Sequence, residues 1–257
     1  MISFQQLKQY SDVVRYKVRA DLKSDGIKTY FGILWWILDP ILFMLVFYVV
    51  FTFIRMRTED FVPFLLIGLV MWQWWNNSLN NGANSIVQAK GLIKQVYLPK
   101  ELFPLVSIFT DTFKFAIVFV LLLVFLWIYG STPTALYIWL PFLLLCQFLL
   151  ILGGAFIVAG IIPFVPDLRF AVQHTLRMMF FMSGVFFPAS RIPEQYLHIY
   201  YLNPMANLIE AFRDVLLYHR EPSPERLIMI AVTSFAVFLV GWAVIRHFDR
   251  TYPKVIH

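Results

Sequence analysis

Residues 181–213 read FMSGVFFPASRIPEQYLHIYYLNPMANLIEAFR, and this broken, aromatic-rich stretch constrains how the rest of the chain is arranged. It leaves an apolar run at Pro188, passes Pro193 and Pro204, and ends in an amphipathic segment over residues 206–217. Backbone that is not regular helix cannot face lipid, because its N–H and C=O groups would find no partner there. We therefore expect it at a membrane surface or along a wet cavity. An ordinary loop with a short surface helix is the simpler alternative.

The composition is typical of an integral membrane protein. Of the 257 residues, 60% are hydrophobic, 18% aromatic and only 14% charged, and several apolar runs are long enough to cross a bilayer. In such a chain the net charge of +6 fits basic cytoplasmic loops beside anionic lipid better than a nucleic-acid partner. The polar, mixed-charge beginning argues against a cleavable signal peptide.

The apolar runs predict an all-α membrane domain with six transmembrane helices. The predicted spans are 33–54, 61–79, 102–129, 135–162, 170–187 and 227–248. Basic residues gather before the first span, in the 83–100 connection and in the tail, whereas the first outer turn carries only Arg55 and Arg57. Both termini are therefore expected in the cytoplasm, although the four arginines between the last two spans weaken this contrast.

Two predicted cytoplasmic segments, 1–31 and 83–100, carry nine of the 21 lysines and arginines. Residues 1–31 are expected to form a basic amphipathic helix on the membrane surface, because apolar residues recur at helical spacing opposite Arg15, Lys17, Arg19 and Lys23. Residues 83–96 can form a second short helix, whose candidate docking residues are Lys90, Leu92, Ile93, Lys94 and Val96. Such a helix suits a groove on a partner protein. The positive-inside rule alone would also place lysines here.

Asp111 and Lys114 lie inside the third predicted span. They are three residues apart and so share one helical face. Because charges within a bilayer usually pair or face water, a mutual ion pair or a position near the cytoplasmic surface is favoured over a proton relay.

The sequence shows no pattern of a catalytic or metal site. It contains no G-x-x-x-x-G-K-[ST] phosphate loop, no H-E-x-x-H and no C-x-x-C. Its five histidines share no ligand spacing, and the single Cys146 cannot form a disulfide within one chain. We therefore predict no catalytic residue, no metal and no cofactor bound by this chain.

Aromatic side chains are the main candidates for contact with a ligand, because their faces can stack on the C–H surface of sugars while the hydroxyls stay in water. The candidates are Tyr48, Trp72, Trp74, Trp75, Phe186, Phe187, Tyr196, Tyr200 and Tyr201. The alternative is the belt of Trp and Tyr at both interfaces that any membrane protein carries.

The order of these features resembles the ABC-2 polysaccharide-export permeases of capsule, O-antigen and teichoic-acid exporters, with the capsule type nearest. The resemblance rests on SGVFFP (183–188), IPEQY (192–196) and NPMANLIEAFR (203–213). It rests also on RADLK (19–23), followed by Tyr30, Gly32, Leu34-Trp35 and Asp39-Pro40. It covers nearly the whole chain.

The resemblance implies the permease subunit of an ATP-driven exporter that moves a lipid-linked cell-surface polysaccharide across the bacterial cytoplasmic membrane. It implies a pair of such chains and two separate ATP-binding subunits, which hold the ATP and Mg. Residues 83–100 would be the coupling region that meets those subunits, together with the N-terminal helix.

In the same resemblance, residues 188–217 would be an external gate of short re-entrant helices, shaped by Pro188, Pro193 and Pro204. The glycan would pass between the two chains, and its lipid would enter near the first and fifth spans. Two other classes remain open: an ATP-independent lipid-glycan scramblase or membrane-embedded glycosyl-transfer enzyme, and an ABC-2 permease for a small lipid or drug.

Overall fold

The structure is a computed structural model that describes residues 4–28, 34–53, 60–95, 98–249 and 251–252. All regular structure in these ranges is helical. The helices are α1 (Phe4–Lys28), α2 (Leu34–Phe53), α3 (Phe61–Gln88), α4 (Lys90–Gln95), α5 (Leu102–Tyr129), the 3-10 turn η1 (Ala135–Trp139), α6 (Leu140–Ile161), α7 (Leu168–Met182), the 3-10 turn η2 (Ala189–Arg191), α8 (Glu194–Tyr201), α9 (Pro204–Leu216) and α10 (Pro224–Phe248).

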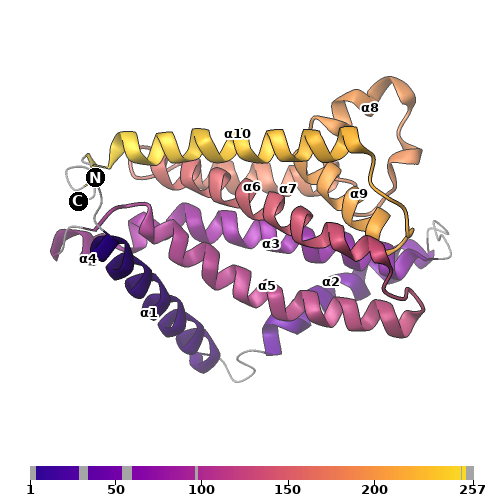
Figure 1. Ribbon diagram of the computed structural model, residues 1–257, viewed down its shortest axis with the longest axis horizontal. Coiled ribbons are helices and arrows are strands. Elements are labelled where there is room, and N and C mark those ends of the chain that lie inside the picture. Colours follow the sequence, from indigo (N-terminus) through magenta and orange to yellow (C-terminus); the bar gives the residue numbers. More distant parts are fainter. Residues whose placement is uncertain (1–3, 29–33, 54–59, 96–97, 250, 253–257) are drawn as a thin grey trace.

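Three segments among the described residues are long and apolar enough to cross a bilayer: Leu102–Tyr129, Ala135–Ile161 and Pro224–Phe248. They coincide with the third, fourth and sixth predicted spans, and an all-helical chain of this kind is an integral membrane protein. Helices α2, α3 and α7 coincide with the other three, whose crossing of the membrane stays a prediction. Figure 1 shows α3, α5, α6 and α10 running along the long axis of the molecule.

Helix α3 is the core of the fold. It is buried over most of its length and packs against α2, α5, α6, α7 and α9. A helix that is apolar on all sides is stable only when other helices surround it. It continues to Gln88, past the predicted end of the second span at residue 79. The asparagines do not end it, because Asn80 and Asn84 donate to the carbonyls of Asn76 and Asn80 at 2.8 Å within the same helix.

Helices α6 and α10 approach so closely that their backbones touch. A Cβ atom at Gly241 would collide with the carbonyl oxygen of Gly153, and one at Gly153 would collide with the backbone at Val237. Small residues permit such an approach, on which helix association in lipid depends. The pair lies side by side along almost its whole length in Figure 1.

The molecule has two distinct ends. Helix α4, the beginning of α1 and the end of α10 lie at one end, and α8 and the start of α10 lie at the other (Figure 1). We call the first the α4 end and the second the α8 end. On the predicted topology the α4 end faces the cytoplasm.

Candidate functional site

Regular helix is interrupted after α7, within the proline-containing stretch 181–213. The fifth predicted span extends to residue 187, but α7 ends at Met182. Ser183 donates to the carbonyl of Met179 at 2.6 Å, and Gly184 follows with a φ of +66°, which a residue with a Cβ rarely adopts. The turn, and not the apolar composition of Val185 to Phe187, decides where the helix ends. Short helices do occupy the predicted gate region, although their re-entry into the membrane stays a prediction.

The NPMAN motif ties the start of α9 to the end of α7. The Asn203 side chain accepts a hydrogen bond from the amide of Met205 at 3.0 Å and donates one to the Ser183 hydroxyl at 2.8 Å. Asn207 donates to the carbonyls of Tyr201 and Asn203 at 2.6 and 3.1 Å. Pro204 at the first position of α9 is compatible with this N-cap. The motif therefore fixes the turn between α8 and α9.

Arg213 anchors α9 in the core, and its side chain is only 1% exposed. Its guanidinium donates to the Phe64 carbonyl from Nε at 3.2 Å and from Nη2 at 3.0 Å, to Gly184 at 2.7 Å and to Val185 at 2.8 Å. It also lies 3.4 Å from the ring centroid of Phe64. Burial lowers the pKa of Arg213 to about 10, so the side chain stays charged at neutral pH.

A network of charged side chains joins α9 to the beginning of α10. Arg226 contacts Asp214 at 2.6 Å and Glu210 at 3.3 Å. Glu210 also accepts from the amide of Ala189 at 3.1 Å and from the Tyr201 hydroxyl at 3.2 Å. Burial, and then the Glu210 carboxylate, raises the pKa of the Tyr201 hydroxyl. This hydroxyl therefore stays protonated and serves as a donor.

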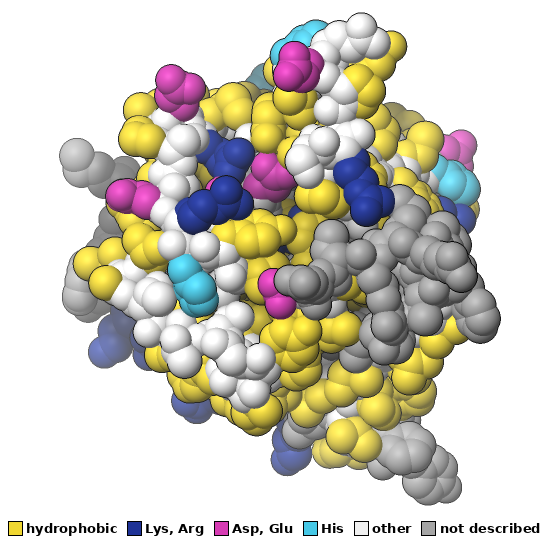
Figure 2. Space-filling model, turned by 90° about the vertical axis from the view of Figure 1, so that its right-hand side faces the viewer, with side chains coloured by type: hydrophobic (Ala, Val, Ile, Leu, Met, Phe, Trp, Pro, Cys, Tyr) yellow, Lys and Arg dark blue, Asp and Glu magenta, His cyan; other side chains and the backbone are white. Residues whose placement is uncertain are grey.

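Glu210, Asp214 and Arg226 border a pocket of about 390 Å³ at the α8 end. Residues 188–190, the second half of α9, the loop 218–223 and Arg226 line it. Figure 2 shows basic and acidic side chains next to one another on this end of the molecule, among hydrophobic and uncharged groups. We call this cavity the external pocket, following the predicted topology.

The predicted channel and gate residues occupy different surroundings. Phe186 and Tyr200 are buried, Phe187, Pro188, Tyr201 and Pro204 are half-buried, and Pro193 and Tyr196 are exposed. Trp72, Trp74 and Trp75 are buried in α3, where Trp74 stacks on Phe115 with ring centroids 4.0 Å apart. Among the predicted channel and gate residues that the structure describes, Pro188 is the one that lines the external pocket. A role of these residues in lining a channel between two chains stays a prediction.

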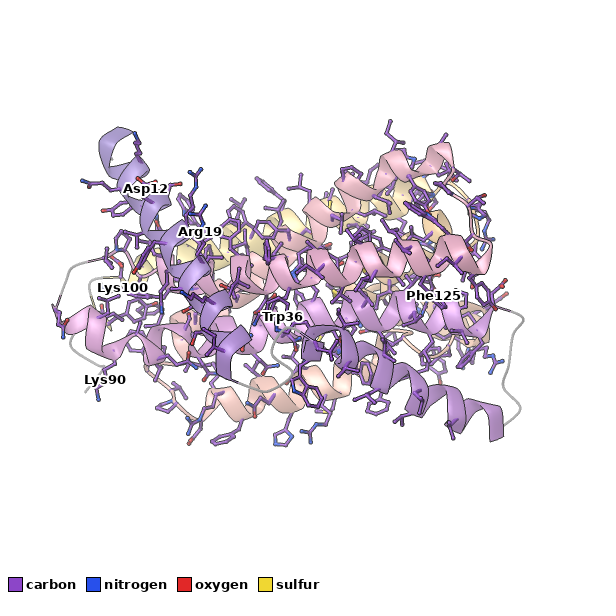
Figure 3. The ribbon with its side chains drawn as sticks, turned by 90° about the horizontal axis from the view of Figure 1, so that it is seen from below. Asp12, Arg19, Trp36, Lys90, Lys100 and Phe125 are labelled. Atoms are coloured by element: carbon purple, nitrogen blue, oxygen red, sulfur yellow. The ribbon has the colours of Figure 1, made fainter. Side chains whose placement is uncertain are left out.

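At the α4 end, the predicted single helix over 83–96 is divided in two. Helix α3 ends at Gln88 and α4 begins at Lys90. Leu92 is 43% exposed, whereas Ile93 is buried in the hydrophobic core. Helix α4 therefore packs on the core through Ile93 and leaves Leu92 accessible at the surface. Figure 3 shows Lys90 and Lys100 at this same end. Some predictions lie outside the described residues or side chains: Tyr30, Gly32, Asp39, Pro40, Tyr48, Arg55, Arg57, Lys94 and Val96.

The residues that follow α4 are held by the end of α10. The amide of Lys100 donates to the Asp249 carboxylate at 3.0 Å, and Arg246 contacts Glu101 at 3.4 Å. The Tyr252 hydroxyl donates to the carbonyl of Gly160 at 3.1 Å. The corner between α4 and α5 is therefore fixed to the α6–α10 pair.

Helix α1 packs against α5, and an ion-pair cluster joins them. Lys114 lies 2.6 Å from Asp25 on α1 and 3.9 Å from Asp111. Asp111 accepts two hydrogen bonds from the Asn81 amide at 3.1 and 2.9 Å. The predicted pair of Asp111 and Lys114 is thus part of a larger cluster in which Asp25 is the nearer partner of Lys114.

Two cavities meet at this cluster. One of about 850 Å³ lies between α1 and α3–α5, and one of about 200 Å³ lies deeper, beside Trp36 and Trp74. Asn81, Asp111 and Lys114 border both. The basic residues Arg15, Lys17, Arg19 and Lys23 of α1 are exposed, and Lys17 pairs with Asp21 at 2.8 Å.

Replacing Lys114 by methionine is expected to destabilise the protein by about 3 kcal/mol, because it removes the ion pair with Asp25 and leaves the buried Asp111 carboxylate without a cation. Adding Asp111→Asn should recover part of this loss, since the second change removes the more deeply buried of the two stranded charges and keeps a polar partner for Asn81, while the ion pair with Asp25 stays lost. Thermal unfolding of the purified single and double variants in detergent measures both effects. A double variant less stable than Lys114→Met alone would contradict the prediction.

Sequence reasoning missed Arg213, the Arg226 network and the Asp25 contact. Arg213 carried one usable signal: it lies four residues after Ile209 and three before Leu216, on the apolar side of an amphipathic helix. No sequence signal indicated the contact between Asp25 and Lys114, because the two residues lie on different helices.

A family model described as ABC-2 type transporter matches residues 24–217, which is more than half of the chain. The chain belongs to the ABC-2 type transporter family. It is 30% identical over 241 residues to an O-antigen export system permease protein of Myxococcus xanthus, with 93% of this chain and 92% of that protein covered. It is 26% identical over 247 residues to an O-antigen export system permease protein of Klebsiella pneumoniae, with 95% of each chain covered.

A relative named for polysialic acid transport aligns over a shorter part of the chain. The polysialic acid transport protein of Escherichia coli is 26% identical over 225 residues, with 84% of this chain and 85% of that protein covered. The family that the sequence resembles is therefore confirmed. Of these three relatives, the two O-antigen permeases align over more of the chain than the polysialic acid transport protein.

Proposed function

We propose that this chain is the permease subunit of an ATP-driven exporter that carries a lipid-linked cell-surface polysaccharide, of the O-antigen or capsule type, across the bacterial cytoplasmic membrane. The observation that carries the proposal is similarity over 93–95% of the chain to permeases named for O-antigen export. Membership of the ABC-2 family and the three apolar membrane-length segments support it.

The proposal includes partners that this chain needs for transport. A second copy of the chain would complete the path for the glycan, and separate ATP-binding subunits would supply ATP hydrolysis with Mg. Helix α4 is the proposed docking element, because exposed Leu92 beside Lys90 offers an apolar contact with a positive neighbour. Both termini would then lie in the cytoplasm.

Docking is tested by co-purification with the ATP-binding subunit that the proposal requires. Leu92→Glu with Lys90→Glu is expected to reduce recovery of that protein at least tenfold, because a carboxylate replaces each contact. Arg191→Glu, on η2 at the α8 end, is the matched charge-reversal control and should leave recovery unchanged. Point changes are preferable to deletion of residues 83–96, which would remove the last turns of α3.

Export is tested in cells that lack the chromosomal copy of this gene. Wild-type protein and Arg191→Glu should restore polysaccharide at the cell surface, and the α4 variant should not. Export in cells without any such ATP-binding protein would refute the proposal and favour an ATP-independent scramblase.

A further inference from the structure

We infer that the external pocket is a binding site for a short, uncharged segment of a sugar chain. This inference deepens the proposed function, on which it rests for the identity of the ligand. It places one contact of the exported glycan within a single chain, at the junction of residues 188–190, α9 and the start of α10.

The charges around the pocket favour a neutral ligand. Glu210, Asp214 and Glu221 border it, and so do Arg213, Arg220 and Arg226, so the formal charges cancel. Most of them are also paired with one another: Asp214 lies 2.6 Å from Arg226 and 3.6 Å from Arg220, and Glu210 lies 3.3 Å from Arg226. A phosphate or a carboxylate would find no excess of positive charge here. A polyol would find many hydrogen-bonding groups.

The hydrogen-bonding groups match sugar hydroxyls, each of which can donate and accept. Carboxylates only accept and guanidinium groups only donate, and both kinds of group line the pocket. Their positions are fixed before any ligand arrives, because Glu210 is held by the Ala189 amide and the Tyr201 hydroxyl. Pre-ordered groups lose little conformational freedom on binding. Glu210 and Asp214 are also mostly withdrawn from water, which strengthens the bonds that they make.

The pocket also offers apolar surface for the C–H faces of a sugar ring. Tyr218, whose side chain is 39% exposed, and Pro188 both border it. Its volume of about 390 Å³ is at the lower end of the range for small-molecule pockets. A segment of roughly one or two sugar residues would fit a pocket of this size.

Binding is measured on the full-length purified protein in lipid nanodiscs. The probes are oligosaccharides of one and two repeat units, released from the polysaccharide of the producing strain. Saturation-transfer NMR and calorimetry should show saturable binding. Asp214→Asn with Tyr218→Ala should weaken it at least tenfold in protein that is still monodisperse and folded at the temperature of the assay, although loss of the Asp214–Arg226 ion pair lowers the thermal midpoint. His198→Ala on exposed α8 is the control and should bind like wild type.

Inorganic phosphate at millimolar concentration should not compete with the oligosaccharide. Competition by phosphate, equal binding by the pocket variant and wild type, or no binding by a wild type that restores export would each overturn the inference. Equal binding by the variant and wild type, or no binding by a wild type that restores export, would not contradict the proposed function. Saturable, pocket-dependent binding by a chain that exports without an ATP-binding protein would support the pocket while refuting the proposed function.

Discussion

Replacing Arg213 by alanine is expected to lower the free energy of unfolding by about 3–5 kcal/mol, the cost of breaking a buried charged network. The change removes four hydrogen bonds, two of them to the Phe64 carbonyl inside α3, and leaves the carbonyls of Gly184 and Val185 without this donor in a buried space. Each buried acceptor without a partner costs about 1–3 kcal/mol. Because these bonds join α9 to α3 and to the turn after α7, the predicted gate region (residues 188–217) should detach from the core.

The loss is measured as a fall in the thermal midpoint of the detergent-solubilised protein and in its recovery as a monodisperse species. Arg213→Lys should be intermediate, since an ammonium group cannot reproduce the planar fork that contacts three carbonyls. Arg191→Ala is the control, because Arg191 is exposed in the same predicted gate region, and it should stay within about 0.5 kcal/mol of wild type. Equal stability of Arg213→Ala and Arg191→Ala would contradict the role given to Arg213.

Local patterns in the sequence were sufficient to locate most helices. Apolar run length places α5, α6 and α10 to within a few residues, because lipid requires continuous helix. The prolines locate the short helices of the predicted gate region, since each removes an N–H and fixes φ. Helix ends were predicted less well where side chains decide them. Asparagines extend α3 by bonding to its own carbonyls, and Ser183 with Gly184 ends α7 within an apolar run.

The contacts that build the candidate sites could not be predicted, because their partners are remote in sequence. Arg213 donates a hydrogen bond to the carbonyl of Phe64, 149 residues away. Every residue has a backbone carbonyl, so the residue type of the acceptor gives no indication of this contact. Lys114 was matched with Asp111 by helical spacing, whereas its nearer partner Asp25 is 89 residues away on α1. The residue types thus predicted that the charged side chains would be paired. Which residue pairs with which is determined by how the helices pack.

Helix α10 connects the two candidate regions of the molecule. Near its start Arg226 holds Glu210 and Asp214 beside the external pocket, and at its end Asp249 holds the corner that follows α4. Between them, Gly241 lies against the backbone of Gly153. A shift of α10 relative to α6 would therefore displace contacts at both ends of the molecule. Such a connection would suit the proposed exporter, in which a movement that begins at α4 would have to reach the α8 end.

Gly241→Leu is accordingly expected to abolish export and to lower the thermal midpoint strongly. Helices in lipid associate through close packing and not through burial from water, so forcing α6 and α10 apart removes most of what holds the pair together. Ala243→Leu is the matched control, because Ala243 is exposed on the same helix, and it should preserve folding and export. The comparison uses midpoints in detergent and surface polysaccharide in complemented cells. Export by Gly241→Leu at the level of Ala243→Leu would show that the close contact of α6 and α10 is not required for transport.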